Sequence, residues 1–235
     1  MSVLFSEENV LVLVPAYNEA GSIAHVLEDL KVTNYKVLVV SDGSTDATST
    51  ITRELGFRVL ELPINLGVGG ALRAGFRIAM KEKFAAVIQI DADGQHPVNE
   101  IAHLISAVNE HQAQMVIGSR FLSGIESMKV GMARRLVMRV LARSSSKATG
   151  INITDTTSGF RIITRPLLDK FAESFPTNYL GDTYEAVVAA GRSGFKVIEI
   201  PATLTDRTSG KSTASLAQSV RFTFKGVVVA LLRLH

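Results

Sequence analysis

The sequence predicts an α/β protein with a mostly parallel, doubly wound central sheet flanked by helices. Continuous apolar runs, typical of strands covered on both faces, alternate through the first 120 residues with segments of helical periodicity. Such regular alternation favours parallel strands joined by crossover helices. The 235 residues can form one domain with a sizeable core, and the lack of cysteine excludes a disulfide framework and a thiolate metal site.

Five strands are expected in the first half. Two of them open the segments 9–19 and 35–46, and the other three span 57–62, 84–90 and 113–119. The first helix is predicted by apolar residues at the spacing i, i+3, i+4 and i+7, which are Ile23, Val26, Leu27 and Leu30. Ser44 or Thr45 is expected to cap the second helix and Gly56 to end it. Two further helices are expected over 68–83 and 98–108.

Three of these strands are followed by polar turns, Tyr17-Asn18-Glu19, Asp42-Gly43-Ser44 and Asp91-Ala92-Asp93. Ligands of open α/β sheets bind outside the carboxyl ends of the strands, so the three turns are expected to share one edge. Asp and Ser are also common turn residues, and each turn taken alone has that structural interpretation. Their coincidence at one edge indicates a binding site.

The segment "DADGQHP" (91–97) carries two carboxylates at i and i+2, which point to the same side of an extended chain. Their repulsion favours a bound divalent cation. Oxygen ligands without cysteine favour Mg²⁺ or Mn²⁺, which bind through one or two carboxylates together with substrate phosphates. We therefore expect a metal site at Asp91, Asp93 and Gln95, with Gln95 or His96 in a supporting position, and a diphosphate as the substrate group.

Two other interpretations of this segment fit less well. The Asp-x-Asp-Gly start of haloacid-dehalogenase-type phosphatases normally continues with Thr or Val on the first strand, whereas Gln95 follows here on the fourth. A calcium loop of the EF-hand type needs a ligand at its fifth position and Glu at its twelfth, which are Gln95 and Ala102 here.

Six segments follow one another in the order seen in family 2 glycosyltransferases, which the chain resembles. They are "VPAYNE" (14–19), "SDGSTD" (41–46), "NLGVGGALRAGF" (65–76), "DADGQHP" (91–97), "GSRF" (118–121) and "DTTSGFR" (155–161). Two later segments, 185–201 and 206–212, resemble the polyprenyl-phosphate branch, which includes dolichyl-phosphate mannose synthases. The resemblance spans about residues 10 to 213 and implies a GT-A fold, with a Rossmann-like nucleotide-binding half and an acceptor half.

The resemblance also implies residues for a GDP- or UDP-linked sugar. The nucleotide-sugar site would be formed by Pro15, Ala16, Tyr17, Glu19, Asp42, Gly43, Ser44, Asn65, Gly67, Gly70, Ala71, Asp91, Ala92 and Asp93. Gly75 of the same glycine-rich segment is equally well explained by close packing of a helix on a strand. The segment is not a P-loop, because no Gly-Lys-Ser/Thr follows.

The acceptor half is basic: six basic residues and no acidic one lie between Glu126 and Asp155. The stripe Arg135, Arg139, Arg143 and Lys147 would lie on one helix face, suited to an anionic membrane surface, to a phosphate or simply to solvent. Nucleic acid is not expected, because no aromatic residue interleaves these charges. Family analogy and the bidentate geometry of arginine make Arg120, Arg134 and Arg135 the expected binders of an acceptor phosphate.

A polyprenyl phosphate acceptor is largely dianionic at neutral pH and needs no strong base. Arg207 and Lys211, beside Gly210, could close over the diphosphate. Asp182 and Glu185 are the acidic candidates if a hydroxyl must be deprotonated instead. The segment 214–235 is apolar but broken by charges, and is expected to be an amphipathic helix that packs on the protein or lies on a membrane.

The sequence therefore predicts a single glycosyltransferase domain over 1–235, with a nucleotide-sugar half at about 8–120 and an acceptor half at about 121–213. The expected reaction is a metal-dependent, inverting transfer of a hexose to a polyprenyl phosphate for cell-envelope glycans. A saccharide or other hydroxyl acceptor is the alternative; a phosphatase and a non-catalytic binder fit less well. No signal peptide is expected, so the chain would be cytoplasmic and peripheral on the cytosolic membrane face. A membrane-anchoring partner and a homo-oligomer are left open.

Overall fold

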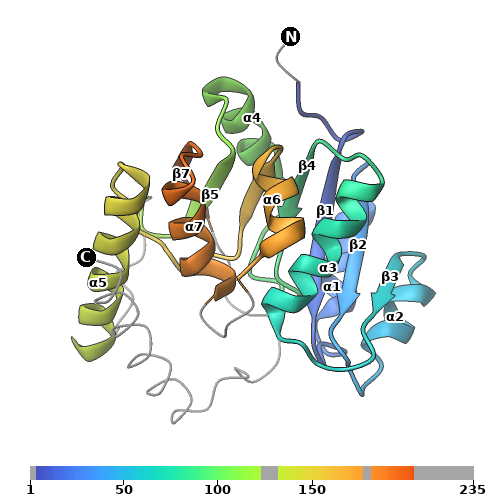
Figure 1. Ribbon diagram of the computed structural model, residues 1–235. Helices are drawn as coiled ribbons and strands as arrows, with labels where there is room; N and C mark the ends of the chain where they lie inside the picture. The colour runs from blue at the N-terminus through green and yellow to red at the C-terminus, as the bar shows by residue number, and fades with distance from the viewer. Residues whose placement is uncertain (1–3, 123–131, 177–180, 204–235) are drawn as a thin grey trace.

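The computed structural model describes residues 4–122, 132–176 and 181–203, with positions 132–137 and 181–182 described by their backbone alone. A seven-stranded sheet in the order β3-β2-β1-β4-β6-β5-β7 forms the centre of the molecule (Figure 1). Its strands are β1 (Val10–Ala16), β2 (Lys36–Ser41), β3 (Arg58–Glu61), β4 (Ala86–Gln89), β5 (Met115–Ser119), β6 (Arg161–Thr164) and β7 (Val197–Pro201).

Six of these described strands run in the same direction, and β6 alone runs against its two neighbours, β4 and β5. The predicted mostly parallel sheet is therefore confirmed. The antiparallel strand has a consequence that local sequence patterns do not reveal. The start of β6 lies beside the end of β4, with Arg161 opposite Gln89.

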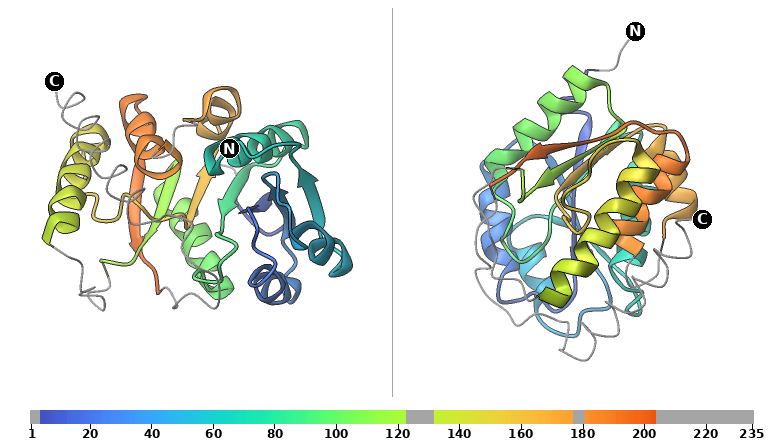
Figure 2. Two further views of the ribbon diagram at one scale, coloured as in Figure 1. Left: turned by 90° about the horizontal axis from the view of Figure 1, so that it is seen from below. Right: turned by 90° about the vertical axis from the view of Figure 1, so that its left-hand side faces the viewer.

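The helices cover both faces of the sheet (Figure 2). They are α1 (Ile23–Lys31), α2 (Thr48–Glu54), α3 (Val68–Lys81), α4 (Ile101–His111), α5 (Met132–Thr149), α6 (Leu167–Ser174) and α7 (Ala186–Arg192). A 3₁₀ turn, η1 (Val98–Glu100), precedes α4, and a π-helical turn, η2 (Gly181–Glu185), precedes α7. α1, α2 and α4 share one hydrophobic core with the sheet, and α3, α6 and α7 share the other. α5 packs on α7 at the outer side of this second layer.

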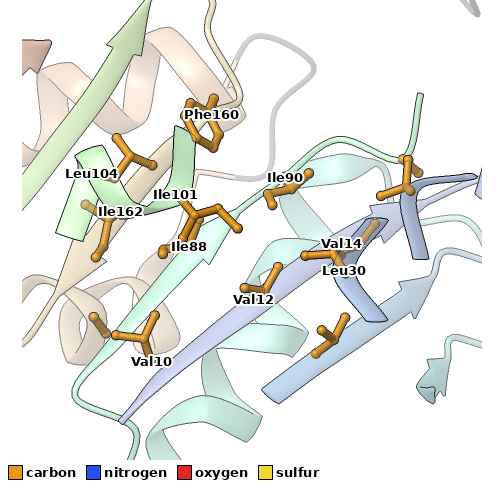
Figure 3. Close-up of a cluster of buried hydrophobic side chains, with 14 of the residues drawn as sticks. Val10, Val12, Val14, Leu30, Ile88, Ile90, Ile101, Leu104, Phe160 and Ile162 are labelled. Atoms are coloured by element: carbon orange, nitrogen blue, oxygen red, sulfur yellow. The ribbon is translucent and has the colours of Figure 1, made fainter. Parts of the chain in front are cut away.

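Alternation along the strands builds these two cores. In β1, Val10, Val12 and Val14 point into the first core and Leu11 and Leu13 into the second. Figure 3 shows the first core, where the valines of β1 lie near the isoleucines of β4 and α4. Burying each such side chain stabilises the fold by about 1.5–3 kcal/mol, so the strands are fixed from both sides.

The beginning of α2 differs from the sequence expectation. The helix starts at Thr48, after Ala47, and neither Ser44 nor Thr45 caps it. Ser44 and Thr45 instead bond to Asn18, as described below, while Asp46 accepts the N–H of Thr48 at 3.0 Å. The predicted helix cap at Ser44 or Thr45 is therefore absent, because these residues bond to the loop after β1 instead. Gly56 does follow the end of α2, with a φ of +83°.

The carboxyl ends of the parallel strands lie level at one edge of the sheet, which we call the rim. Ala16 at the end of β1 lies opposite Ser41 of β2, and Ser41 lies opposite Glu61 of β3. Ile90, just beyond β4, donates its N–H to the carbonyl of Leu13. The three polar turns predicted to share an edge therefore do so.

In the segments that the structure describes, no helix is both long enough and apolar enough to cross a membrane.

Gly43 offers a test of how tightly the rim is packed. It has a φ of +67°, and a Cβ atom there would lie 2.6 Å from both the nitrogen of Asn65 and the carbonyl carbon of Ile64. Gly43→Ala should therefore lower the free energy of unfolding by about 2–4 kcal/mol, because backbone strain adds to overpacking. Gly56→Ala is the matched control, since its φ is similar but nothing lies within 4 Å of the new Cβ. Urea unfolding measures both variants, and an equal loss in the two would contradict the packing argument.

Candidate functional site

The first two polar turns are bonded to each other through Asn18. This residue has a left-handed backbone, with a φ of +55°. Its N–H donates to Ser44 Oγ at 3.1 Å, and its Oδ1 accepts the N–H of Thr45 at 2.8 Å. Next along the chain, the N–H of Glu19 donates to Thr48 Oγ1 at 2.8 Å. The loop after β1 therefore holds the loop after β2 in a fixed position.

Other residues predicted to bind the nucleotide sugar lie on these two bonded loops. Pro15 and Ala16 end β1, and Tyr17 follows with 39% of its surface exposed. Glu19 accepts a hydrogen bond from Ser22 Oγ at 2.7 Å, which directs its carboxylate back toward the start of α1. Tyr17 and Asn18 are thus exposed in this turn, while the Glu19 carboxylate is bonded to its own helix.

Asp42 joins a third loop to these two. Its side chain is buried, and its Oδ1 accepts the N–H of Leu66 at 2.8 Å, while its own N–H donates to the carbonyl of Ala16 at 2.8 Å. Burial raises the pKa of Asp42 above its ordinary value, and the N–H groups of Leu66 and Gly67 offset this only in part. The carboxylate expected to contact the nucleotide therefore also fastens the loop before α3.

The glycine-rich loop closes this side of the rim. Asn65 Oδ1 accepts the N–H of Gly67, whose φ is +78°, at 3.0 Å. A Cβ at Gly70 would lie 2.4 Å from Leu66 Cβ, so Gly70 permits the loop to fold onto the first turn of α3, where Ala71 follows. Gly75 faces the Leu13 side chain at similarly short range, which supports its packing interpretation.

Asp91, Ala92, Asp93 and Gln95 form a turn after β4. Asp93 is buried, and its Oδ1 accepts the N–H of Gln95 at 3.1 Å. The Asp91 side chain is 37% exposed and lies against the backbone of Gly159, where a Cβ would fall 2.5 Å from Asp91 Oδ2. The loop 155–161 must therefore carry glycine at this point to leave room for the carboxylate.

The turn fits a hard cation through its chemistry, because both carboxylates and the Gln95 side chain offer oxygen ligands. In the described residues no group of three or more His, Cys, Asp or Glu side chains could enclose a metal ion. An ion at this turn would need further oxygen ligands from a substrate or from water. This matches the way Mg²⁺ and Mn²⁺ are held between carboxylates and phosphates.

His96 closes the turn from the inside. Its side chain is only 3% exposed, and its Nδ1 accepts the N–H of Asp91 at 3.0 Å. Its ring stacks on Phe160 with the ring centroids 5.2 Å apart. Burial lowers the pKa of His96 below its ordinary value, although the charges of Asp91 and Asp93 act in the opposite direction.

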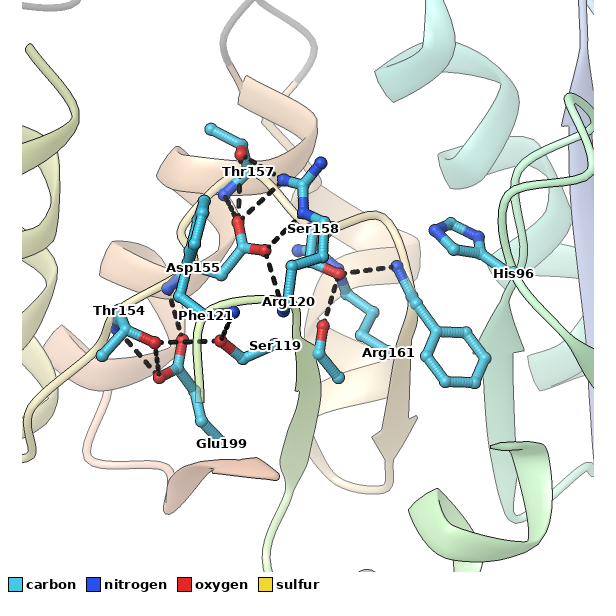
Figure 4. A network of polar contacts seen from close by, with 12 residues as sticks. His96, Ser119, Arg120, Phe121, Thr154, Asp155, Thr157, Ser158, Arg161 and Glu199 are labelled. Carbon is cyan, nitrogen blue, oxygen red and sulfur yellow. Dashed lines mark hydrogen bonds and ion pairs between the residues drawn. The ribbon is translucent and has the colours of Figure 1, made fainter. Parts of the chain in front are cut away.

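Arg120 lies beyond β5 and is clamped by Asp155 (Figure 4). Its Nε donates to Asp155 Oδ2 at 2.8 Å and its Nη2 to Oδ1 at 3.0 Å, while Nη2 also reaches Thr157 Oγ1 at 2.9 Å. The Asp155 side chain is fully buried and that of Arg120 is 22% exposed. Burial alone would raise the pKa of Asp155, but the hydrogen bonds and charge of Arg120 lower it below its ordinary value.

Glu199 of β7 anchors the same loop from below, as Figure 4 shows. Its Oε2 accepts the N–H and the hydroxyl of Thr154 at 2.8 and 2.9 Å, and its Oε1 accepts the N–H of Asp155 at 2.7 Å. Burial raises the pKa of Glu199 in spite of these bonds. Neither Asp155 nor Glu199 was among the predicted site residues. The sequence signal for Asp155 was the segment 155–161, which carried the family resemblance but no assigned role.

Glu185 lies at the end of η2 and is 6% exposed. The buried Arg161 donates to the carbonyl of Thr183, at 3.4 Å, and to that of Ser158. It therefore connects the turn that carries Glu185 to the loop that contacts Asp91. Asp182 belongs to η2, but its side chain is not described.

The remaining predicted residues lie outside these contacts. Arg134 and Arg135 fall in the first turn of α5, where only the backbone is described. The helix expected for the basic stripe is present, and Arg139, Arg143 and Lys147 are exposed on it. Arg207 and Lys211, and the segment 214–235, lie outside the described residues.

Comparison with known proteins gives this geometry a family. The sequence model described as "Glycosyl transferase family 2" matches residues 11–171. Polyprenol monophosphomannose synthase of Mycolicibacterium smegmatis is 30% identical, with 88% of this chain and 82% of that protein covered. Undecaprenyl-phosphate mannosyltransferase of Micrococcus luteus is 29% identical, with 88% and 87% covered.

Among solved structures, glucosyl-3-phosphoglycerate synthase from Mycobacterium tuberculosis, in complex with Mn²⁺, UDP-glucose and phosphoglyceric acid, superposes with a TM-score of 0.69. Its sequence is 22% identical, and the match covers 95% of this chain and 78% of that one, so this likeness concerns the fold. With the family match over residues 11–171, it identifies the chain as a member of glycosyl transferase family 2, a glycosyltransferase with a GT-A fold.

Proposed function

We propose that this glycosyltransferase transfers a hexose from a nucleoside-diphosphate sugar to a polyprenyl phosphate, with the aid of Mg²⁺ or Mn²⁺. The observation that carries the proposal is the meeting of the carboxylate turn 91–95 with the three bonded loops at one rim. The acceptor class is supported by two relatives, each covered over more than four fifths of its length, whose names specify polyprenol and undecaprenyl phosphate.

On the donor side, the bonded loops after β1, β2 and β3 would bind the nucleoside. Tyr17 offers an exposed ring for the base, and Asp42 offers a carboxylate whose position is fixed by the N–H of Leu66. The diphosphate would extend from this pocket toward Asp91 and Asp93. Because the loops are already bonded to one another, little ordering would be needed when the donor binds, which favours accurate positioning.

The cation, when bound, would stabilise the charge that develops on the departing diphosphate. Asp91, Asp93 and Gln95 would hold it, with Asp91 backed by Gly159 and His96. Arg207 and Lys211 are proposed to add positive charge near the same diphosphate. The acceptor phosphate is a dianion, so no proton has to be removed from it. The protein then contributes to the chemical step by orienting the donor sugar and the acceptor phosphate.

Arg120 is proposed to bind the acceptor phosphate together with Arg134 and Arg135. Two nitrogens of the Arg120 guanidinium donate to the Asp155 carboxylate at 2.8 and 3.0 Å, and these bonds fix the orientation of the guanidinium plane. An arginine held in this way retains its charge and loses little further freedom on binding a phosphate. Arg139, Arg143 and Lys147 are exposed on α5, and this basic face supports contact with the anionic cytosolic face of a membrane.

A hydroxyl acceptor is the alternative, and one observation favours it. Glu185 is buried on a turn that Arg161 ties to the loop beside Asp91, which is a suitable place for a base. Glu185 or Asp182 would then remove the acceptor proton. The solved relative that carries phosphoglyceric acid is itself named for a different acceptor from that of the two mannosyltransferases.

A transfer assay separates these two functions. Labelled GDP- and UDP-sugars are offered with Mn²⁺ and a short polyprenyl phosphate, and the lipid fraction is counted. We expect transfer into lipid, reduced about 100-fold or more by Asp93→Asn, because a metal ion supplies several kcal/mol of charge stabilisation. Asp29→Asn, at an exposed position on α1, is the matched control and should retain activity. Metal-dependent hydrolysis of the donor without lipid product would reject the polyprenyl acceptor.

A second prediction concerns the clamp on Arg120. Asp155→Asn should lower the free energy of unfolding at pH 7 by about 2–4 kcal/mol, because it leaves a partly buried guanidinium without its carboxylate. The pKa of Asp155 is lowered in the folded state. Its stabilising contribution is therefore complete above the ordinary pKa of about 3.9 and is lost as the pH falls through the folded value. Urea unfolding at several pH values should show a constant gap between wild type and variant above about pH 5, narrowing near pH 3. A gap that does not depend on pH would contradict this assignment.

A further inference from the structure

His96 is enclosed at the rim, and so far it has been described only as a residue that could support the carboxylate turn. It lies between the carboxylate turn on one side and the loop 155–161 on the other, with 3% of its side chain exposed. A histidine in contact with solvent could serve as a surface proton carrier, but this one is shielded. Its contacts must therefore explain its presence.

The first contact is with Asp91. The backbone N–H of Asp91 donates to Nδ1 of His96 at 3.0 Å, so Nδ1 is an acceptor and the ring proton resides on Nε2. Nε2 in turn lies 3.8 Å from Asp91 Oδ2. One ring thus contacts the backbone of Asp91 and faces its carboxylate, which restricts both the position and the direction of that side chain.

The second contact is with Phe160. The two rings stack with an interplanar angle of 29°. Phe160 is itself fixed, because its N–H donates to Ser158 Oγ at 3.2 Å and Ser158 Oγ donates to the carbonyl of Gly118 at 2.7 Å. Gly118 also lies close beneath the ring, where a Cβ would be 2.5 Å from Phe160 Cδ1. The support for His96 therefore extends into β5.

Two local features shape the carboxylate turn itself. Gly94 has a φ of +79°, and the N–H of Gln95 donates to Asp93 Oδ1 at 3.1 Å. Two carboxylates two residues apart repel each other, so contacts that hold the turn without a cation favour the arrangement that can bind one. The His96 contacts act on the backbone of the first carboxylate and are independent of any cation.

We propose that His96 is a positioning residue that pre-forms the divalent-cation site by holding the backbone of Asp91 through Nδ1. Its ring, held by Phe160, transmits the rigidity of β5 to the carboxylate turn. The inference rests on the proposed metal-dependent function and adds a residue that touches neither the cation nor the substrate. Residues that orient metal ligands in this way typically change metal affinity 10- to 100-fold when replaced.

Two replacements of His96 separate the hydrogen bond from the stack. His96→Asn places a side-chain oxygen near the position of Nδ1 and removes the ring, while His96→Phe keeps a ring and removes the acceptor. Mn²⁺ binding is measured by electron paramagnetic resonance of the free ion, with GDP or UDP present. We expect His96→Phe to weaken Mn²⁺ binding about 10- to 100-fold, and His96→Asn to remain within about threefold of wild type. His103→Phe, at an exposed position on α4, is the control and should bind like wild type.

The outcomes are distinct. Wild-type affinity in His96→Phe, or equal losses in both variants, would overturn the role of Nδ1. Failure of the wild-type protein to bind Mn²⁺ with either nucleotide would instead reject the proposed metal-dependent function, and with it this inference.

A second measurement is made on the wild-type protein and uses a variant only to assign the resonance. ¹⁵N-labelled histidine in the wild-type protein should give one buried ring with the proton on Nε2, assigned by its loss in His96→Asn. Its resonances should shift when Mg²⁺ and the nucleotide are added. A proton found on Nδ1 would overturn the proposal whatever the Mn²⁺ affinities of the variants.

Discussion

The antiparallel pairing of β4 with β6 is the constraint on which the rest of the site depends. Because β6 runs against β4, its first residue lies beside the last residue of β4, as the pair Gln89 and Arg161 shows. The turn that follows β4 and the loop that precedes β6 therefore meet at the rim. Gly159 and Phe160 can contact Asp91 and His96 only because this ladder sets their register.

Three carboxylates hold the loops of the rim, the buried Asp42 and Asp155 and the half-buried Glu199, and they differ in how their charge is balanced. Asp42 and Glu199 are bonded to backbone N–H groups, and burial raises the pKa of each. Asp155 faces the guanidinium of Arg120, and its pKa is lowered. The physical reason is that N–H dipoles recover part of the cost of desolvation, whereas a bidentate cation recovers more than all of it. Of the three, Asp155 is thus the one whose surroundings stabilise the charged form more than water does.

The two halves of the site are built in different ways. On the proposed donor side, neighbouring loops bond directly to one another through Asn18, Asp42 and Asp46, so the site depends on short bridges between turns. On the proposed acceptor side, the loop 155–161 is held at Asp155 by two bonds, one from the side chain of Arg120 and one to the side chain of Glu199. The first arrangement would suit the proposed nucleotide, which must bind in one orientation. The second holds the charged group that is proposed to bind the acceptor phosphate.

The alternation of strands and helices, the common edge of three polar turns, and the carboxylate pair Asp91 and Asp93 were all predicted from the sequence. Each of them follows from periodicity or from side chains only a few residues apart. The direction of β6, the clamp between Arg120 and Asp155, the anchoring by Glu199 and the stack of His96 on Phe160 were decided by the tertiary structure. The same holds for Ser44, which contacts Asn18 instead of capping α2. These contacts join residues far apart in the chain, 35 positions in the case of Arg120 and Asp155. No local pattern records such a pairing, because it depends on how strands are ordered in the sheet.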